Sequence, residues 1–275
     1  MPRPAATGAA AAAAAAAAQP RPLVSDLAPM LQKVAELNNG LEALPSLVPF
    51  VVDGHVLGRM RPEFAEKLAS RGDVFQITAA QGQQQQQQQQ QQTIRLNPAL
   101  ATEQERTRAV AGFVEAPDGT KRLWVARRSR TKQTWPGKLD HIVAGGQPYG
   151  ISCRDNVIKE CGEEASVPPE LAAQAVAAGF ISYVSLLPEG LKPDVLYCYD
   201  LRLPEDFVPQ PQDGEVEEFV LWDLERVAHV IAHTDDYKPN CGVVVMDFLV
   251  RHGYITPDMP GYTRLVAGMR EGGPC

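Results

Sequence analysis

The sequence predicts a mixed α/β protein in which a layered α/β/α domain follows a small α+β module. From Arg106 onward, short β-type segments alternate with amphipathic helical segments, as in domains built from helices on both faces of a sheet. Two low-complexity stretches interrupt the remaining chain. We expect four parts: a low-complexity or targeting segment at 1–22, an N-terminal module at 23–79, a glutamine-rich linker at 80–107 and the main domain at 108–275.

Composition excludes several classes of protein. The 275 residues carry a formal net charge of -7, so no global positive field favours nucleic acid as a partner. The five cysteines contain no CxxC pair, which is typical of reduced thiols in an intracellular protein. Outside the alanine tract, no apolar run is long enough for a membrane span, so no membrane partner is expected.

The N-terminal tract and the glutamine tract are both expected to lie outside the packed fold. Residues 1–22 are mostly alanine, contain Arg3 and Arg21, and precede the first acid, Asp26. An acid-free segment with arginines fits an organelle transit peptide, although serines are lacking and repeat expansion is the alternative. Residues 81–92 are nearly pure glutamine, which predicts a disordered loop or linker.

The N-terminal module is predicted to contain two helices and a hairpin. Apolar residues recur at helical spacing from Leu23 to Leu37, and two β-type runs flank the turn at Asp53-Gly54. Pro62 opens a second helix that closes near Gly72. So few elements cannot bury a large core, and we expect the module to pack on its neighbour.

The main domain begins with a predicted hairpin, AVAGFVEA and RLWVARR, around the turn at 117–119. Further strands are expected at 179–187, 194–203 and in VEEFVLWD. Helices are expected from Pro168 to Ala178, in LERVAHVIAH, and from Cys241 to Gly253 with Asn240 as the cap.

Three acids, Glu160, Glu163 and Glu164, share one side of a predicted helix at i, i+3 and i+4 spacing. Ser152 is its expected N-cap, with Asp155 at capping-box spacing. Like charges so placed repel one another, and a hard divalent cation that also binds substrate phosphates would neutralise them. A surface helix with scattered acids is the alternative.

A basic loop precedes this helix and contains Arg127, Arg128, Arg130 and Lys132. Charge runs are usually solvated faces, but phosphate and metal sites need both signs of charge. Both interpretations stay open on the residues alone.

The stretch from Gly145 to Val167 resembles the Nudix box, G-x5-E-x7-R-E-U-x-E-E-x-G-U, in continuous register. Gly145, Val167 and the three helix acids match the pattern. Three positions depart from it: Ile151 replaces a glutamate, Lys159 an arginine and Ser166 a glycine. Lys159 retains a cation beside the acids, although without the fork of a guanidinium.

The flanking sequences are similar to the Nudix subfamily that carries a DUF4743-type N-terminal module, which includes plant plastid members and the Nudix half of fungal thiamine pyrophosphokinase fusions. PFVVDGHVLGRMRP, KPDVLYCYDL, DGEVEEF and YKPNC carry this resemblance. It implies a longer segment between Arg108-Ala109 and Gly112-Phe113, and so predicts a truncated N-terminal module and a shortened first Nudix strand.

The resemblance implies a Nudix α/β/α sandwich that hydrolyses the diphosphate of thiamine diphosphate derivatives, including oxo- and oxythiamine diphosphate, to monophosphate. The cofactor would be Mg²⁺ or Mn²⁺, the partner a small-molecule diphosphate, and the location the chloroplast if residues 1–22 target it, or otherwise the cytoplasm. Metal ligands would be Glu160, Glu163 and Glu164. Expected catalytic residues are Lys159, Glu163, Glu164, Glu215 and Glu218. Expected substrate-binding residues are Arg128, Arg130, Lys132, Gly145 and Gly146.

Two alternatives remain open. The first is a pyrophosphohydrolase for nucleoside diphosphate derivatives or ADP-ribose, because the box does not choose the substrate. The second is a noncatalytic Nudix-like binding module, motivated by Ile151 and the absent segment.

Overall fold

The structure is a computed structural model that describes residues 20–52, 55–69, 75–79, 92–96, 107–148, 150–188 and 190–272. The alanine tract up to residue 19, most of the glutamine tract, the Asp53-Gly54 turn and the helix end near Gly72 lie outside the described residues.

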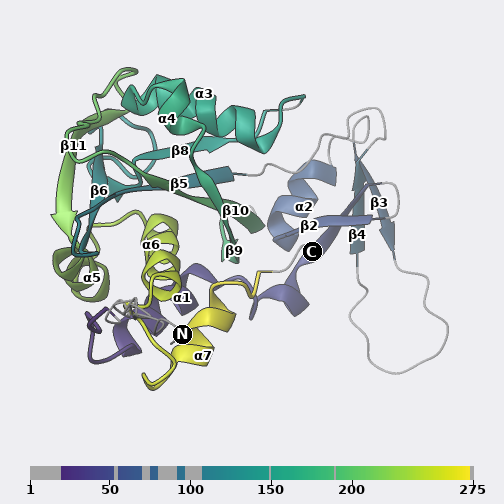
Figure 1. The fold of residues 1–275 in the computed structure, drawn as a ribbon. Coiled ribbons are helices and arrows are strands. Elements are labelled where there is room, and N and C mark those ends of the chain that lie inside the picture. Colours follow the sequence, from purple (N-terminus) through teal and green to yellow (C-terminus); the bar gives the residue numbers. More distant parts are fainter. Residues whose placement is uncertain are drawn as a thin grey trace, which may run out of the picture.

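The larger domain is built on one mixed sheet whose main path runs β11-β6-β5-β10-β9 (Figure 1). Neighbouring strands are antiparallel except for β5 and β10, which are parallel. Two short strands extend it: β7 pairs with β6, and β8 pairs with β5. The bounds are β5 Thr107–Glu115, β6 Lys121–Arg128, β7 Leu139–Asp140, β8 Val143–Gly146, β9 Val176–Leu186, β10 Leu191–Arg202 and β11 Val216–Asp223.

The central strand β5 separates two cores because its side chains alternate between the faces of the sheet. Ala109, Ala111 and Phe113 join one core, whereas Val110 and Val114 join the other. The strand is nine residues long and buried along its length between its two terminal residues. Burial on both faces explains its nearly continuous apolar sequence.

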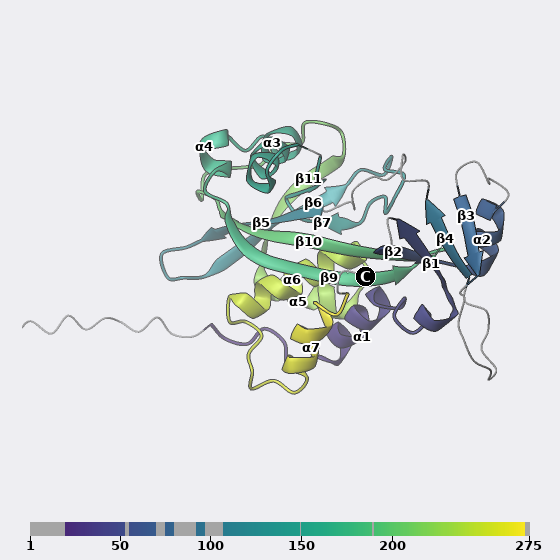
Figure 2. The same cartoon turned by 90° about the vertical axis from the view of Figure 1, so that its right-hand side faces the viewer.

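Helices cover both faces of this sheet (Figures 1 and 2). On one face lie α3 Cys153–Ala165 and α4 Pro169–Ala172. On the other face lie α1 Ala28–Leu37, α5 Leu224–His233, α6 Pro239–Arg251 and α7 Tyr262–Gly268. The predicted α/β/α sandwich is thereby confirmed. Within the described residues, no helix is long and apolar enough to cross a bilayer.

The N-terminal region contributes to both parts of the molecule. Its small sheet has the order β2-β1-β4-β3 and is accompanied by a 3-10 turn and α2. The bounds are η1 Leu44–Ser46, β1 Val48–Val52, β2 His55–Met60, α2 Pro62–Ala69, β3 Phe75–Ala79 and β4 Gln92–Leu96. The range expected as a linker therefore contains a strand, β4, that pairs with both β1 and β3.

Helix α1 belongs to the main core rather than to the small sheet. Met30 and Val34 are buried in the same core as α6 and α7. The buried Asn38 side chain donates to the Gly268 carbonyl at 2.9 Å and accepts from the Val184 amide at 3.1 Å. The module thus packs on its neighbour, as its size predicts.

Two local predictions were wrong. The helix expected from Pro168 to Ala178 ends at Ala172, and β9 already begins at Val176, where pairing with β10 overrides the helical propensity of alanine. Asn240 does not cap α6, which starts at Pro239, two residues earlier than predicted, with Lys238 as the N-cap. The Asn240 amide instead donates to the Tyr183 hydroxyl at 3.0 Å.

Candidate functional site

The acidic helix α3 begins at the predicted cap. The Ser152 hydroxyl accepts from the Asp155 amide at 3.1 Å and donates to the Asp155 carboxylate at 2.7 Å. Val157, Cys161 and Ala165 then follow at four-residue spacing and are buried against the sheet. One stripe of α3 is therefore fixed by packing, and this positions the acids on the adjoining faces.

Glu160 lies directly against the glycine-rich strand β8. A Cβ atom added to Gly145 would stand 2.7 Å from the Glu160 carboxyl carbon, so a side chain there would displace the acid. The Glu160 side chain is only 17% exposed, whereas that of Glu163 is 55% exposed. Lys159 contacts both carboxylates, at 3.6 Å and 2.6 Å respectively.

Glu164 is the acid held deepest in the site. Its carboxylate accepts from the Ala144 amide at 3.1 Å and faces a small cavity that it shares with Arg128, His141 and Glu215. Burial raises the pKa of Glu164 to about 8, and the negative charges of Asp140 and Glu160 act in the same direction. Burial therefore favours the protonated form of Glu164, although Arg128 lines the same cavity.

A buried arginine that the sequence interpretation missed supports β8 from below. Arg108 is 2% exposed, and its guanidinium donates to the Gly145 carbonyl at 3.2 Å. Burial lowers its pKa, while the charge of Glu160 partly offsets this effect. The signal was a charged residue at the start of a strand that is otherwise apolar.

Glu215, just before β11, and Glu218, within it, lie in different surroundings. The Glu215 carboxylate lines the same cavity as Glu164 and pairs with Lys132 at 2.6 Å. Glu218 instead pairs with Arg127 at 3.0 Å, opposite it in the strand register. The structure thus brings Glu215, but not Glu218, together with Glu164.

The basic residues also divide into different settings. Arg128 is largely buried and holds Asp140 at 2.7 Å together with the carbonyls of Thr134 and Trp135. Arg130 is 82% exposed and lies 3.5 Å from Glu217. These contacts make Arg128 a structural anchor of the loop between β6 and β7, whereas Arg130 remains in solvent.

The Gly145 and Gly146 carbonyls accept from side chains beneath α3. Gly145 accepts from Arg108, as described above, and Gly146 accepts from the buried Asn156 amide at 3.2 Å. A Cβ atom added to Gly146 would meet no atom within 4 Å, so this side of the residue faces open space.

The glycine position near the end of the box is occupied by Ser166 in a left-handed conformation, with φ at 53°. This conformation closes α3 in the manner usual for glycine, and a non-glycine residue adopts it at some cost. The Ser166 hydroxyl donates to the Gln210 carbonyl at 3.0 Å and accepts from the Gln212 amide at 2.7 Å. These bonds explain how serine substitutes there.

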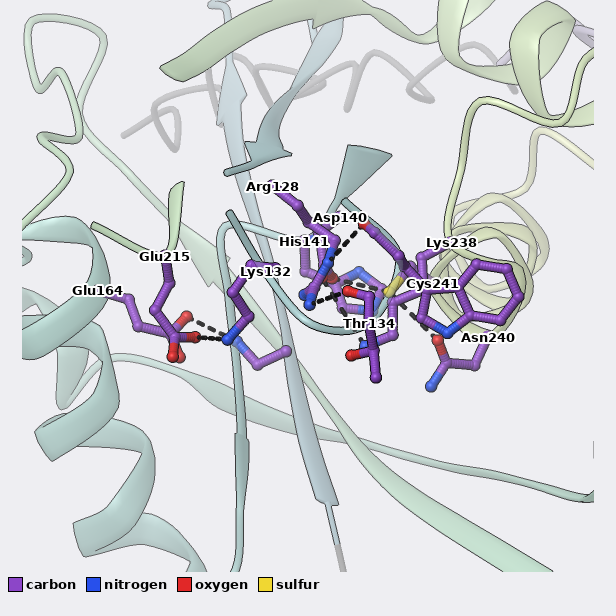
Figure 3. A network of polar contacts seen from close by, with 12 residues as sticks. Arg128, Lys132, Thr134, Asp140, His141, Glu164, Glu215, Lys238, Asn240 and Cys241 are labelled. Carbon is purple, nitrogen blue, oxygen red and sulfur yellow. Dashed lines mark hydrogen bonds and ion pairs between the residues drawn. The ribbon is translucent and has the colours of Figure 1, made fainter. Parts of the chain in front are cut away.

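A second group of metal-ligating side chains lies beneath the acid site. Ligand atoms of Asp140, His141 and Cys241 lie within 4.8 Å of one another, and all three residues are buried (Figure 3). The Cys241 thiol donates to Asp140 at 2.7 Å, and neither ring nitrogen of His141 has a partner in the described structure. The sequence interpretation assigned no role to this trio.

Basic residues next to this trio, Lys238 and Arg128, supply the positive charge that stabilises the Asp140 carboxylate. Burial raises the pKa of Asp140, but Lys238, the Cys241 hydrogen bond and Arg128 outweigh this effect and lower it to about 2. Burial also lowers the pKa of His141 to about 4 and raises that of Cys241 well above its usual range. The trio is thus a stable carboxylate, a neutral imidazole and a neutral thiol.

Two family models match the chain. Residues 105–240 match the NUDIX domain, and residues 29–133 match DUF4743, a domain of unknown function. The first match contains α3, β8 and the acids of the site, whereas the second contains α1 and the small sheet.

Two plant relatives match most of the chain. "Nudix hydrolase 24, chloroplastic" from Arabidopsis thaliana is 37% identical over 300 residues, covering 90% of this chain and 79% of the relative. "Nudix hydrolase 20, chloroplastic" from the same plant is 37% identical over 299 residues with the same coverage. Among solved structures, the NUDIX domain of Shewanella oneidensis NrtR complexed with ADP ribose is 15% identical, with a TM-score of 0.42, and the match covers 56% of this chain and 94% of that one. The chain belongs to the Nudix hydrolases and is a diphosphohydrolase.

Proposed function

We propose that this enzyme cleaves the diphosphate of thiamine diphosphate derivatives, including oxo- and oxythiamine diphosphate, to monophosphate and phosphate with Mg²⁺ or Mn²⁺. One observation carries the chemistry: Glu160 and Glu164 flank the glycine-rich strand β8, and Glu215 lies across the same cavity from Glu164. Carboxylates converging on a small cavity are the ligand type that hard divalent cations prefer.

The residues present fit such a cation. Within the described residues, Lys159 is the only basic residue that forms ion pairs with the helix acids, and it contacts Glu160 and Glu163. Burial, aided by the negative charges of Asp140 and Glu160, raises the pKa of Glu164, and a divalent ion held by Glu160, Glu163 and Glu164 would favour its carboxylate form. When bound, the ion would lower the pKa of a coordinated water and neutralise the diphosphate.

The remaining residues divide the work around the bound diphosphate. Lys132 and Arg130, on the loop after β6, are placed to bind the phosphate oxygens that do not react. Arg128 holds that loop in position through Asp140, and Gly145 lets Glu160 approach the backbone. Glu215 is the preferred candidate for the base because it lines the same cavity as Glu164, and Glu218 ranks behind it because it does not line that cavity.

The thiamine assignment rests on the similarity of the flanking motifs to the DUF4743-containing subfamily, and the match to that domain supports it. Hydrolysis of ADP-ribose or nucleoside diphosphate derivatives is the second candidate, because the box acids contact the diphosphate rather than the organic group. A noncatalytic binding module is the third, and the three retained acids argue against it. The names of the two plant relatives support a chloroplast location.

Phosphate release with Mg²⁺ from oxythiamine diphosphate, thiamine diphosphate and ADP-ribose tests the proposal. We expect the wild type to prefer oxythiamine diphosphate and Glu164→Gln to lose about 100-fold or more in kcat, since one ligand of the charge-stabilising site is lost. Glu170→Gln, on the exposed side of α4, is the matched control and should retain full activity. Equal rates for wild type and Glu164→Gln would refute the metal site, and turnover of ADP-ribose alone would refute the thiamine assignment.

A further inference from the structure

A second cavity, of about 420 Å³, lies where α1 meets the Nudix domain. Its apolar lining comes from α1, the loop between β6 and β7, the end of β9 and the α5–α6 region. The main apolar contributors are Leu37, Trp135, Leu186, Ile231, Tyr237 and Pro239. A cavity of this size and character is typical of a site for the organic part of a small molecule.

Trp135 presents its indole to this cavity from a strained backbone. Its φ is 53°, a left-handed value that is unusual for a bulky residue, and its side chain is the largest exposed apolar group of the loop, at 47% exposure. The Trp135 carbonyl accepts from the Arg128 guanidinium at 3.1 Å and from the Lys138 amide at 3.4 Å, which fixes the conformation. Strain maintained to expose an aromatic ring indicates a binding role.

Arg128, which lines the acid cavity, also contacts the loop that contributes Trp135 to the second cavity. The Arg128 guanidinium contacts the Asp140 carboxylate, which lines the acid cavity, and the carbonyls of Thr134 and Trp135 on the other side. Figure 3 shows Glu164 and Glu215 on one side of Arg128, with Lys238 and Cys241 on the other side. A single residue therefore joins the acid cavity to the loop that carries Trp135.

The charges at the second cavity do not favour a phosphate. Lys33 pairs with Asp235 at 2.8 Å and donates to the Thr234 carbonyl at 2.7 Å, and Lys138 donates to the Asp235 carbonyl. Both ammonium groups are thus engaged by the protein. Glu36 adds a further carboxylate to the lining. An indole face beside carboxylates attracts a planar ring, and a cationic ring most of all.

We infer that this cavity binds the planar organic group of the diphosphate substrate and that Trp135 stacks on it. The inference rests on the proposed function for the position of the diphosphate. It assigns a binding role to the junction between α1 and the Nudix domain, so substrate selection would depend on both parts of the chain.

Steady-state kinetics of the full chain with oxythiamine diphosphate test the inference. Trp135→Ala should raise KM at least tenfold and change kcat less than threefold, while Trp135→Phe should remain within threefold of wild type because a phenyl ring still stacks. Inhibition by inorganic diphosphate, which has no ring, should be unchanged in Trp135→Ala. Phe180→Ala, which removes another exposed aromatic ring outside the cavity, is the matched control.

Direct binding separates this inference from the choice of substrate. Trp124 and Trp222 are each 6% exposed, so quenching of tryptophan fluorescence by a ring compound in the cavity reports mainly on Trp135. Oxythiamine and adenosine, both without phosphate, serve as probes in the presence of EDTA. At least one of them should quench the tryptophan fluorescence of the wild type but not that of Trp135→Phe. The inference would be overturned if KM is unchanged in Trp135→Ala, or if inhibition by inorganic diphosphate weakens in that variant as much as substrate binding does. It would also be overturned if neither probe quenches the fluorescence, even if the enzyme hydrolyses its diphosphate.

Discussion

The acids of α3 and the buried trio beneath them contain similar metal-ligating groups but differ in their balance of charge. Asp140 is surrounded by Arg128, Lys238 and the Cys241 thiol, which together lower its pKa to about 2. Glu164 is also removed from water, and this burial, together with the negative charges of Asp140 and Glu160, raises its pKa to about 8 although Arg128 lines the same cavity. The two buried carboxylates therefore differ in how far nearby basic groups offset the effect of burial on the pKa.

The difference has a structural origin. The trio gathers around β7, where β6 supplies Arg128 and the start of α6 supplies Lys238. The acids of α3 face β8, which offers backbone amides and glycines rather than basic side chains. The trio therefore acts as part of the scaffold, and the acids of α3 stay available for a metal ion and substrate.

Removing the charge of Asp140 is expected to give the largest effect on folding. Asp140→Asn would leave the largely buried Arg128 without its partner, and we expect the free energy of unfolding to fall by about 3–5 kcal/mol. Urea denaturation measures this loss. Asp206→Asn, an exposed carboxylate near the end of β10, should change stability by less than about 0.5 kcal/mol. A loss below about 1 kcal/mol for Asp140→Asn would show that the ion pair does not anchor the loop.

The grouping of the three helix acids could be predicted from the sequence because they lie close together along the chain. Glu160, Glu163 and Glu164 lie within one helical turn, and the capping box at Ser152 and the buried stripe on Val157 determine how that turn faces the sheet. Helical periodicity and a contiguous motif contain all of this information. The same holds for the central strand and for the hairpin of β5 and β6.

The trio was not predicted because its members are distant along the chain. Asp140 and Cys241 are 101 residues apart and meet only because α6 packs beside β7. The error at Asn240 has the same cause, since its contact with Tyr183 depends on tertiary packing across the sheet. The early start of β9 likewise follows from pairing with β10, which local propensity cannot reveal.

The pH dependence of the free energy of unfolding, measured without metal, should distinguish the acids of α3 from the buried trio. We expect an effect smaller than that of Asp140→Asn. The pKa of Glu164 is raised from about 4.5 to about 8, so the folded state binds its proton more tightly than the unfolded state. The resulting stabilisation is fully present below the unfolded pKa and is lost as pH rises toward 8. In EDTA we expect unfolding free energy to fall by about 1–3 kcal/mol between pH 5 and pH 8, after allowance for solvent screening.

Denaturation at both pH values, with EDTA or with Mg²⁺, measures this effect. Mg²⁺ should restore stability at pH 8, and Glu164→Gln should abolish the decrease, while Glu170→Gln should retain it. An identical decrease in Glu164→Gln would mean that another group is responsible. Asp140 contributes no loss in this window, because its lowered pKa affects stability only as pH falls below its ordinary value of 3.8.

Substitution of Cys241 is expected to give the smallest change in the free energy of unfolding, and it tests the trio most specifically. If the trio is a self-neutralised scaffold, Cys241→Ala removes one hydrogen bond to Asp140 and should cost about 0.5–1.5 kcal/mol, with Cys241→Ser closer to wild type because it retains a donor. If the trio instead held a structural zinc ion, binding energy of about 10 kcal/mol or more would be linked to folding. A strong chelator would then destabilise the wild type at every pH, and both variants would lose that response. Chemical denaturation with and without chelator at pH 6 separates these outcomes. If the thiol is a neutral, buried hydrogen-bond donor to an ion-paired carboxylate, its removal lowers the free energy of unfolding only slightly, and a chelator does not change that loss.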